Sequence, residues 1–152
     1  VVSVDTDMAW IRRLQNLTGD SAGSRRLHQV HYAKTHAELH SFGFGNLWAV
    51  VLVDHRYGLR RHVDAISYAR RAKIVVLHDA ERLNEYAYRY EQGHVRDHFR
   101  YVCKFTLFQN KERTSWVSTL LLSNYIDLRY FDAAIFRKIN TDFGLVGCDL
   151  SY

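Results

Sequence analysis

The chain has 152 residues, of which 47% are hydrophobic and 24% charged, a composition typical of a globular domain with its own core. No apolar run approaches the roughly 20 residues of a membrane span, so no membrane-spanning helix is predicted. The net charge of +5 would suit a nucleic-acid or acidic-glycan partner. A solvated basic surface is favoured, because the arginine pairs are scattered along the sequence.

The two cysteines, Cys103 and Cys148, lack the spacing of a metal site. They fit a reducing compartment and favour the cytoplasm, although one disulfide bond would also be allowed. The chain begins at Val1 inside a strand-like run, without a basic and then apolar leader. We therefore expect it to be a fragment of a longer protein, in which a targeting segment could lie upstream.

The first third of the chain predicts strands and helices in alternation. A β-branched run ending at Asp5 is typical of a buried strand, and Asp7 is suited to cap the helix that follows. The expected elements are a strand over 1–4, a helix after Asp7, a strand over 27–33 and a short helix over 35–40.

The middle of the chain predicts a strand, a helix and a second strand. Residues 47–53 are a continuous apolar run and residues 74–77 continue Lys73 with a shorter one; both segments are predicted to be buried strands, and the first is typical of a strand covered on both faces. The helix between them has an apolar stripe predicted to face the core, formed by Leu59, Val63, Ile66 and Ala69. Its arginines are predicted to face solvent, and these are Arg60, Arg61, Arg70 and Arg71.

An acid and a histidine follow each of these two strands, as Asp54-His55 and as His78-Asp79. Two parallel strands joined by a helix end at the same edge of a sheet, where open α/β sheets bind ligands. The sequence therefore predicts that the four side chains gather at one edge.

The pattern changes in the last third. Residues 99–108 alternate between apolar and polar side chains, whereas 116–122 are almost entirely apolar. This predicts a hairpin whose second strand inserts into the sheet and whose first strand lies at its edge. Helices are expected after Asp79 as far as Gly93 and over 126–139, and residues 140–152 are expected to be an irregular tail.

Four segments in this order resemble the class I S-adenosylmethionine-dependent methyltransferases. VVSVDTD resembles that family's second strand, WAVVLVDHRYGLRR its fourth strand and IVVLHDAE its fifth strand. TSWVSTLLLSN resembles the hairpin strand of one subgroup, and the similarity to the plant glucuronoxylan O-methyltransferases is looser. The resemblance implies an α/β fold with a Rossmann-like, mostly parallel sheet, helices on both faces and a C-terminal antiparallel hairpin.

One part of the family pattern is missing. The first strand and its glycine-rich loop, which hold the methionine part of the cofactor, have no counterpart in this sequence. The resemblance places that strand in the middle of the sheet, so its absence would leave two strand edges unpaired. We expect residues 1–139 to form a partial methyltransferase-like domain, with the missing strand upstream of Val1.

The resemblance also implies roles for acids at the strand ends. Asp5 would bind the ribose hydroxyls of S-adenosylmethionine, because a carboxylate accepts both hydrogens of a diol. Asp54 would lie where the amino group of the cofactor meets the acceptor, and is a candidate for both cofactor binding and catalysis. His78 is the second catalytic candidate, as the residue of the fifth strand that faces the pocket.

Four residues are candidates for substrate binding, and each has a structural alternative: His55, Tyr57, Arg60 and Asp79. His55 could be a base or could bond the loop backbone, and Asp79 could instead cap a helix. Arg60 and Arg61 could hold an acceptor carboxylate or phosphate, or be solvated. A metal site formed by the acids and histidines of the two strand ends is less favoured, and no metal is assigned.

We predict S-adenosylmethionine-dependent O-methylation of a small-molecule or sugar hydroxyl. The alternatives are RNA methylation, suggested by the basic charge and a tyrosine-rich segment, and a non-catalytic Rossmann-like binding module without the cofactor loop.

Overall fold

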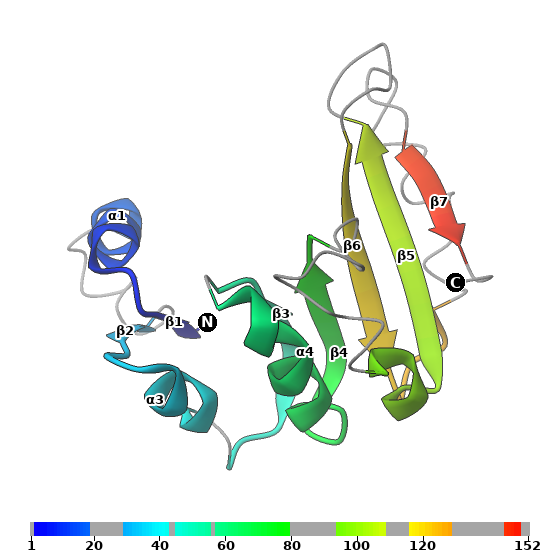
Figure 1. Ribbon diagram of the computed structural model, residues 1–152, viewed down its shortest axis with the longest axis horizontal. Helices are drawn as coiled ribbons and strands as arrows, with labels where there is room; N and C mark the ends of the chain where they lie inside the picture. The colour runs from blue at the N-terminus through cyan, green and yellow to red at the C-terminus, as the bar shows by residue number, and fades with distance from the viewer. Residues whose placement is uncertain are drawn as a thin grey trace. The chain divides into compact units, whose positions relative to one another are not determined.

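The computed structural model describes residues 2–18, 29–42, 45–55, 57–79, 94–108, 116–128 and 145–149. The chain divides into two compact units, Val1–Gly45 and Asn46–Tyr152, whereas one domain was expected. Each unit contains strands and helices, so the α/β class predicted from the sequence is confirmed (Figure 1).

The first unit alternates strands and helices as predicted. Its elements are β1 (Val2–Asp5), α1 (Met8–Thr18), β2 (Gln29–Tyr32) and α3 (His36–Ser41). Strands β1 and β2 pair in parallel, with Asp5 opposite Tyr32. Asp7 caps α1, because its Oδ1 accepts from the backbone N–H of Ala9 at 2.8 Å. Ile11 of α1 is buried.

The second unit is built on one mixed sheet, with the strand order β3-β4-β6-β5-β7 (Figure 1). Its strands are β3 (Trp48–Val53), β4 (Ala72–His78), β5 (Tyr101–Phe108), β6 (Trp116–Ser123) and β7 (Leu145–Asp149). The pair β3–β4 is parallel and the other three pairs are antiparallel. This sheet is therefore mostly antiparallel, whereas a mostly parallel sheet was expected.

The inserted hairpin predicted from the sequence is confirmed. Strand β6 lies between β4 and β5, and its Leu120 and Leu122 are buried in the core. Strand β5 does not lie at the edge as expected, because β7 pairs with its other side. Residues 145–149 had been assigned to an irregular tail, and this assignment was wrong. The run is short, and its pairing with β5 is a long-range contact that local pattern does not report.

A 3-10 helix, η2 (Val95–His98), and the helix α4 (Gly58–Ser67) complete the described elements of this unit. The core joins α4 and η2 to the sheet through residues with little exposure: Val53, Ala65, Ala69, Ala72, Val75, Leu77, Val95, Phe99, Leu120 and Leu122. The helix expected after Asp79 falls outside the described residues, as does all but the start (126–128) of the helix expected over 126–139.

The buried face of α4 differs from the predicted one. Leu59 and Val63 are exposed, whereas Arg61, Asp64 and Ala65 are buried. The prediction for Arg61 was wrong because it assumed that a charged residue must face solvent. A guanidinium can be buried where it is fully paired.

Strand β3 is not covered on both faces by the described chain. Val50 is 54% exposed and Leu52 is 63% exposed, and these alternate residues lie on the same face of the strand. The apolar run was therefore a correct signal for a strand but not for complete burial.

Cys103 on β5 is buried and disulfide-bonded, and Cys148 on β7 is the only other cysteine of the sequence. A bonded cysteine corresponds to the alternative that the sequence left open, rather than to the reducing compartment that it favoured. Among the described residues, no helix has the length and apolar character needed to cross a membrane.

Candidate functional site at the ends of β3 and β4

The carboxyl ends of β3 and β4 lie side by side, because the two strands are parallel and Val53 is in register with Leu77. The residues that follow are Asp54 and His78, so the backbone alone places these two side chains at one edge of the sheet. His78 Nδ1 lies 3.5 Å from Asp54 Oδ1. The predicted meeting of the two strand ends is confirmed for this pair.

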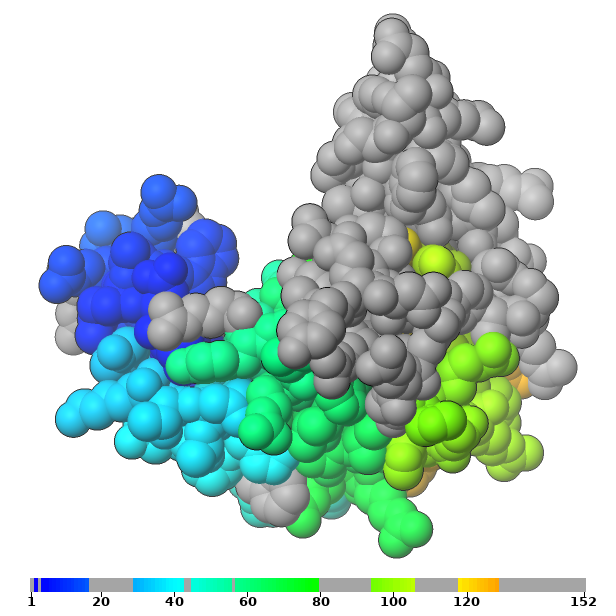
Figure 2. Space-filling model, viewed as in Figure 1, coloured from blue at the N-terminus to red at the C-terminus, as the bar shows by residue number. Residues whose placement is uncertain are grey.

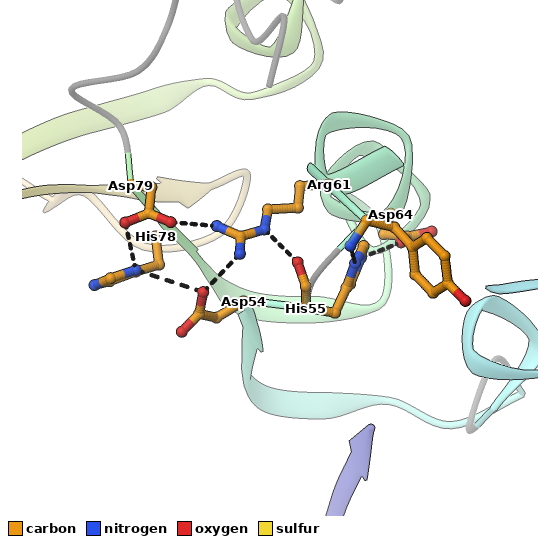
Figure 3. Close-up of polar contacts among 7 residues, drawn as sticks. Asp54, His55, Arg61, Asp64, His78 and Asp79 are labelled. Carbon is orange, nitrogen blue, oxygen red and sulfur yellow. Dashed lines mark hydrogen bonds and ion pairs between the residues drawn. The ribbon is translucent and has the colours of Figure 1, made fainter. Parts of the chain in front are cut away.

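Arg61 organises this edge from the first turns of α4 (Figure 3). Its side chain is 7% exposed and makes three polar contacts. Nε donates to the carbonyl oxygen of His55 at 2.6 Å, Nη1 donates to Asp79 Oδ2 at 2.7 Å, and Nη2 lies 3.0 Å from Asp54 Oδ1. One guanidinium therefore ties the end of β3 to the end of β4 and balances two carboxylates.

The His78 ring is held by these carboxylates. Its Nδ1 lies 3.1 Å from Asp79 Oδ1 and 3.5 Å from Asp54 Oδ1. Neither contact has hydrogen-bond geometry at Nδ1. Ionised carboxylates only accept hydrogen bonds, so two acids beside Nδ1 favour the proton on this nitrogen when the ring is neutral. Nε2 then has the lone pair, and it points away from both acids (Figure 3).

Asp79 has a positive φ angle, which is unusual for a residue other than glycine. Its φ is +58°, in the left-handed region that Asp tolerates better than most residues. This conformation turns the chain directly after β4, and its carboxylate reaches both Arg61 and His78. The prediction that Asp79 caps a helix concerns residues outside those that the structure describes.

His55 belongs to a separate buried pair. Its Nε2 lies 2.6 Å from Asp64 Oδ2, and its Nδ1 accepts from the backbone N–H of Tyr57 at 3.2 Å. This pattern assigns the proton to Nε2, which donates to Asp64. His55 therefore holds the loop between β3 and α4, which is the structural alternative, and its ring contacts Asp64 rather than the carboxylates beside His78 (Figure 3).

The remaining candidates are Tyr57 and Arg60 of the second unit and Asp5 of the first unit. The Tyr57 ring lies 6.0 Å from the His55 ring, and Arg60 is exposed on α4. Asp5 lies in the first unit, at the end of β1, where its Oδ1 accepts from the Asp7 N–H at 2.8 Å. This contact is the turn role considered for Asp5, and it uses one of the two carboxylate oxygens.

Asp64 also changes the chemistry of a neighbouring tyrosine. Burial raises the pKa of Tyr68, the Asp64 carboxylate raises this pKa further, and Arg71 opposes the increase. Tyr68 directly follows α4. Because its pKa is raised, its phenol stays protonated to a higher pH than that of an ordinary tyrosine.

Asp54, His78 and Asp79 each place one ligand atom within 4.8 Å of the others, as a divalent cation would require. Arg61 competes with a cation here, because its guanidinium engages an oxygen of both acids. The geometry therefore favours a cluster made by protein groups alone over the metal alternative.

Asp64 was not predicted from the sequence, and Arg61 was predicted to hold an acceptor anion or to be solvated rather than to be buried between two acids. Arg61, Ala65 and Ala69 recur at a spacing of four, so Arg61 shares a helix face with two alanines that allow close packing. Asp64 lies three residues after Arg61 on that face. The shared face with two alanines therefore indicates that Arg61 and Asp64 are both buried.

Comparison of the chain with protein-family models, with curated proteins and with solved structures gives no match.

Proposed function

We propose that this chain is part of a class I S-adenosylmethionine-dependent methyltransferase that acts on a hydroxyl of a small molecule or sugar. The observation that carries the proposal is the strand order β3-β4-β6-β5, in which the second strand of a late hairpin inserts antiparallel beside two parallel strands. This is the order that the sequence resemblance implied for the fourth strand onward.

The first unit is consistent with the same proposal. Its two strands are parallel, and β1 ends in the acid Asp5, as the second strand of the family does. Strand β7 departs from the pattern by pairing outside the hairpin. We therefore propose, as part of the same hypothesis, that these strands belong to a Rossmann-like sheet.

The sequence resemblance assigns one cofactor contact to each unit. Asp5 would bind the ribose diol through the carboxylate oxygen that the turn does not use, and Asp54, at the end of β3, would hold the amino group. When bound, the cofactor supplies an electrophilic methyl group on a sulfonium. The glycine-rich loop of the family has no counterpart in this sequence, so the chain would supply only part of the cofactor site.

His78 is the base in this proposal. Its Nδ1 lies beside the carboxylates of Asp79 and Asp54, which favour a proton there, and Nε2 is directed away from them. Nε2 would take the proton of the acceptor hydroxyl while the oxygen forms its bond to carbon and the carbon–sulfur bond breaks. The products are a methyl ether, S-adenosylhomocysteine and a protonated His78. General-base catalysis of this kind contributes about 10²- to 10⁴-fold in rate.

A non-catalytic binding module is the alternative from a different class. It is distinguished by ligand response, because a module without the cofactor site has no reason to prefer S-adenosyl compounds. RNA methylation differs only in the acceptor, so it predicts the same cofactor response but labelled RNA as the product.

The test is a thermal-shift measurement on the complete gene product that contains this chain. S-adenosylmethionine and S-adenosylhomocysteine should each raise the melting temperature, whereas adenosine at the same concentration should raise it less. Asp5→Asn and Asp54→Asn should reduce both shifts, and the matched variant Asp7→Asn, which retains a helix-capping oxygen, should preserve them. Equal shifts in melting temperature for all three compounds, or no shift with any of them, would contradict the proposal.

A further inference from the structure

A second surface lies at the opposite end of β4 from the candidate site. Three segments meet there: the turn after α4 up to the start of β4 (68–73), η2 with the start of β5 (94–101), and the residues after β6 (123–127). They contain five of the chain's 21 arginines and lysines and two of its 16 acids. Over the seven residues of β4, the two ends are separated by about 20 Å.

Asn124 holds the three segments together. Its Nδ2 donates to the carbonyl oxygens of Ala69 and His98, at 3.0 and 2.9 Å, and its Oδ1 accepts from the Arg100 N–H at 2.7 Å. Ser123 adds a bond from its Oγ to the Lys73 carbonyl at 2.6 Å. The segments 68–73, in green, and 94–101, in yellow-green, adjoin in the space-filling view (Figure 2). The basic side chains are therefore presented from one fixed framework.

The cations of this surface are accessible. Arg70, Lys73 and Arg100 are exposed, and none of them forms an ion pair in the part of the chain that the structure describes. The Arg100 guanidinium lies 5.2 Å from the centre of the Tyr101 ring, which leaves its charge in place. The exposed acid Asp97 instead lies 3.3 Å from His94.

An aromatic ring stands beside these charges. Tyr125 is 59% exposed, yet its hydroxyl donates to the carbonyl oxygen of Arg70 at 3.0 Å. This bond fixes a large apolar side chain at the surface instead of in the core. A ring held in this way, next to Arg70, resembles the stacking positions that bind unpaired bases.

We propose that this surface, formed by Arg70, Lys73, Arg100 and Tyr125, binds single-stranded nucleic acid. The three cations contact successive phosphates, and the Tyr125 ring stacks on one base. Single strands are favoured over duplexes because only an unpaired base offers its face to a side chain. The surface lies away from Asp54 and His78, so this inference does not depend on the proposed methyl transfer.

The test is fluorescence anisotropy with a labelled short oligouridylate and the intact chain. The affinity should fall as salt rises, and replacing Arg70, Lys73 and Arg100 together by alanine should reduce the slope of log K against log salt by about 2. Tyr125→Ala should weaken binding about ten-fold, whereas Tyr125→Phe retains the ring and should stay within about two-fold of the native chain. Arg60→Ala, at the far end of α4, is the matched control and should bind like the native chain.

Circular dichroism of each variant separates loss of binding from loss of fold. The inference is overturned if the native chain does not bind oligouridylate, or if the folded triple variant binds as tightly as the native chain. Tighter binding of an acidic oligosaccharide, such as a heparin fragment, would overturn it in favour of a glycan surface.

Discussion

Arg61 and Asp79 are joined by a hydrogen bond of 2.7 Å between Nη1 and Oδ2, which connects the first turns of α4 to the residue that ends β4. Asp79 adopts a left-handed backbone conformation at this point. The bond therefore fixes a turn that most residues would avoid, and it sets the position of the His78 ring beside it.

Arg61→Met should destabilise the chain by about 3 kcal/mol, because it leaves the His55 carbonyl and the Asp79 carboxylate without their donor. Arg61→Lys retains the charge but not the three-pronged contact, and should fall between Met and the native residue. Urea unfolding measures both. The exposed neighbour Arg60→Met should change stability by no more than about 0.5 kcal/mol. Equal effects at the two positions would contradict the account of the site.

Asp64→Ala should cost about 1–3 kcal/mol, because it leaves the buried Nε2–H of His55 unsatisfied. A double-mutant cycle with His55→Ala isolates the pair, and we expect a coupling energy of about 0.5–3 kcal/mol. Additive effects would show that the 2.6 Å contact does not hold the loop.

Tyr68 should lower the stability of the chain at alkaline pH. Its folded pKa lies above the ordinary value of 10.0, so the unfolded chain loses this proton at a lower pH than the folded chain. Stability from this group is complete below pH 10.0 and falls as the pH rises toward the folded pKa. Tyr68→Phe should remove this part of the decline in unfolding free energy, and Asp64→Ala should reduce it. An ordinary Tyr68 titration by NMR would contradict the prediction.

The His78 ring should be the Nδ1–H tautomer when it is neutral, since Asp79 and Asp54 face Nδ1. Long-range nitrogen–proton NMR spectra of the ring distinguish the two tautomers. Asp79→Asn should shift the population toward Nε2–H, because an amide can donate to Nδ1. A native ring that is already Nε2–H would remove the basis for His78 as a base.

Reduction of the disulfide at Cys103 should lower stability by about 2–4 kcal/mol. Denaturant unfolding with and without dithiothreitol measures the loss, and alkylation without reductant checks the starting state. Cysteines that react with the alkylating reagent in the unfolded, unreduced chain would show that the bond is not formed.

The sequence predicts the fold correctly where a local pattern, such as a helix cap or an apolar strand, determines the structure. Asp7 was predicted and found as a helix cap, and the apolar segment that contains Leu120 and Leu122 was predicted and found as the inserted strand. Apolar periodicity and capping act within a few residues, so the chain itself carries this information.

Long-range pairing and burial of charge were not readable in this way. Strand β7 depends on β5, about 40 residues earlier in the chain, and nothing in its own five residues shows that partner. Arg61 is buried because acids from two strand ends meet its guanidinium. The meeting of Asp54 and His78 at one sheet edge was predicted from the sequence, but the burial of Arg61 beside them was not.

The proposed function depends on cofactor binding at the ends of β3 and β4. The most direct measurement is ultraviolet cross-linking of methyl-labelled S-adenosylmethionine to the complete gene product, followed by peptide mapping. The account predicts label in peptides that contain Asp54 or His78, and loss of this label with excess S-adenosylhomocysteine. No cross-link, or label confined to other segments and insensitive to competition, would contradict it.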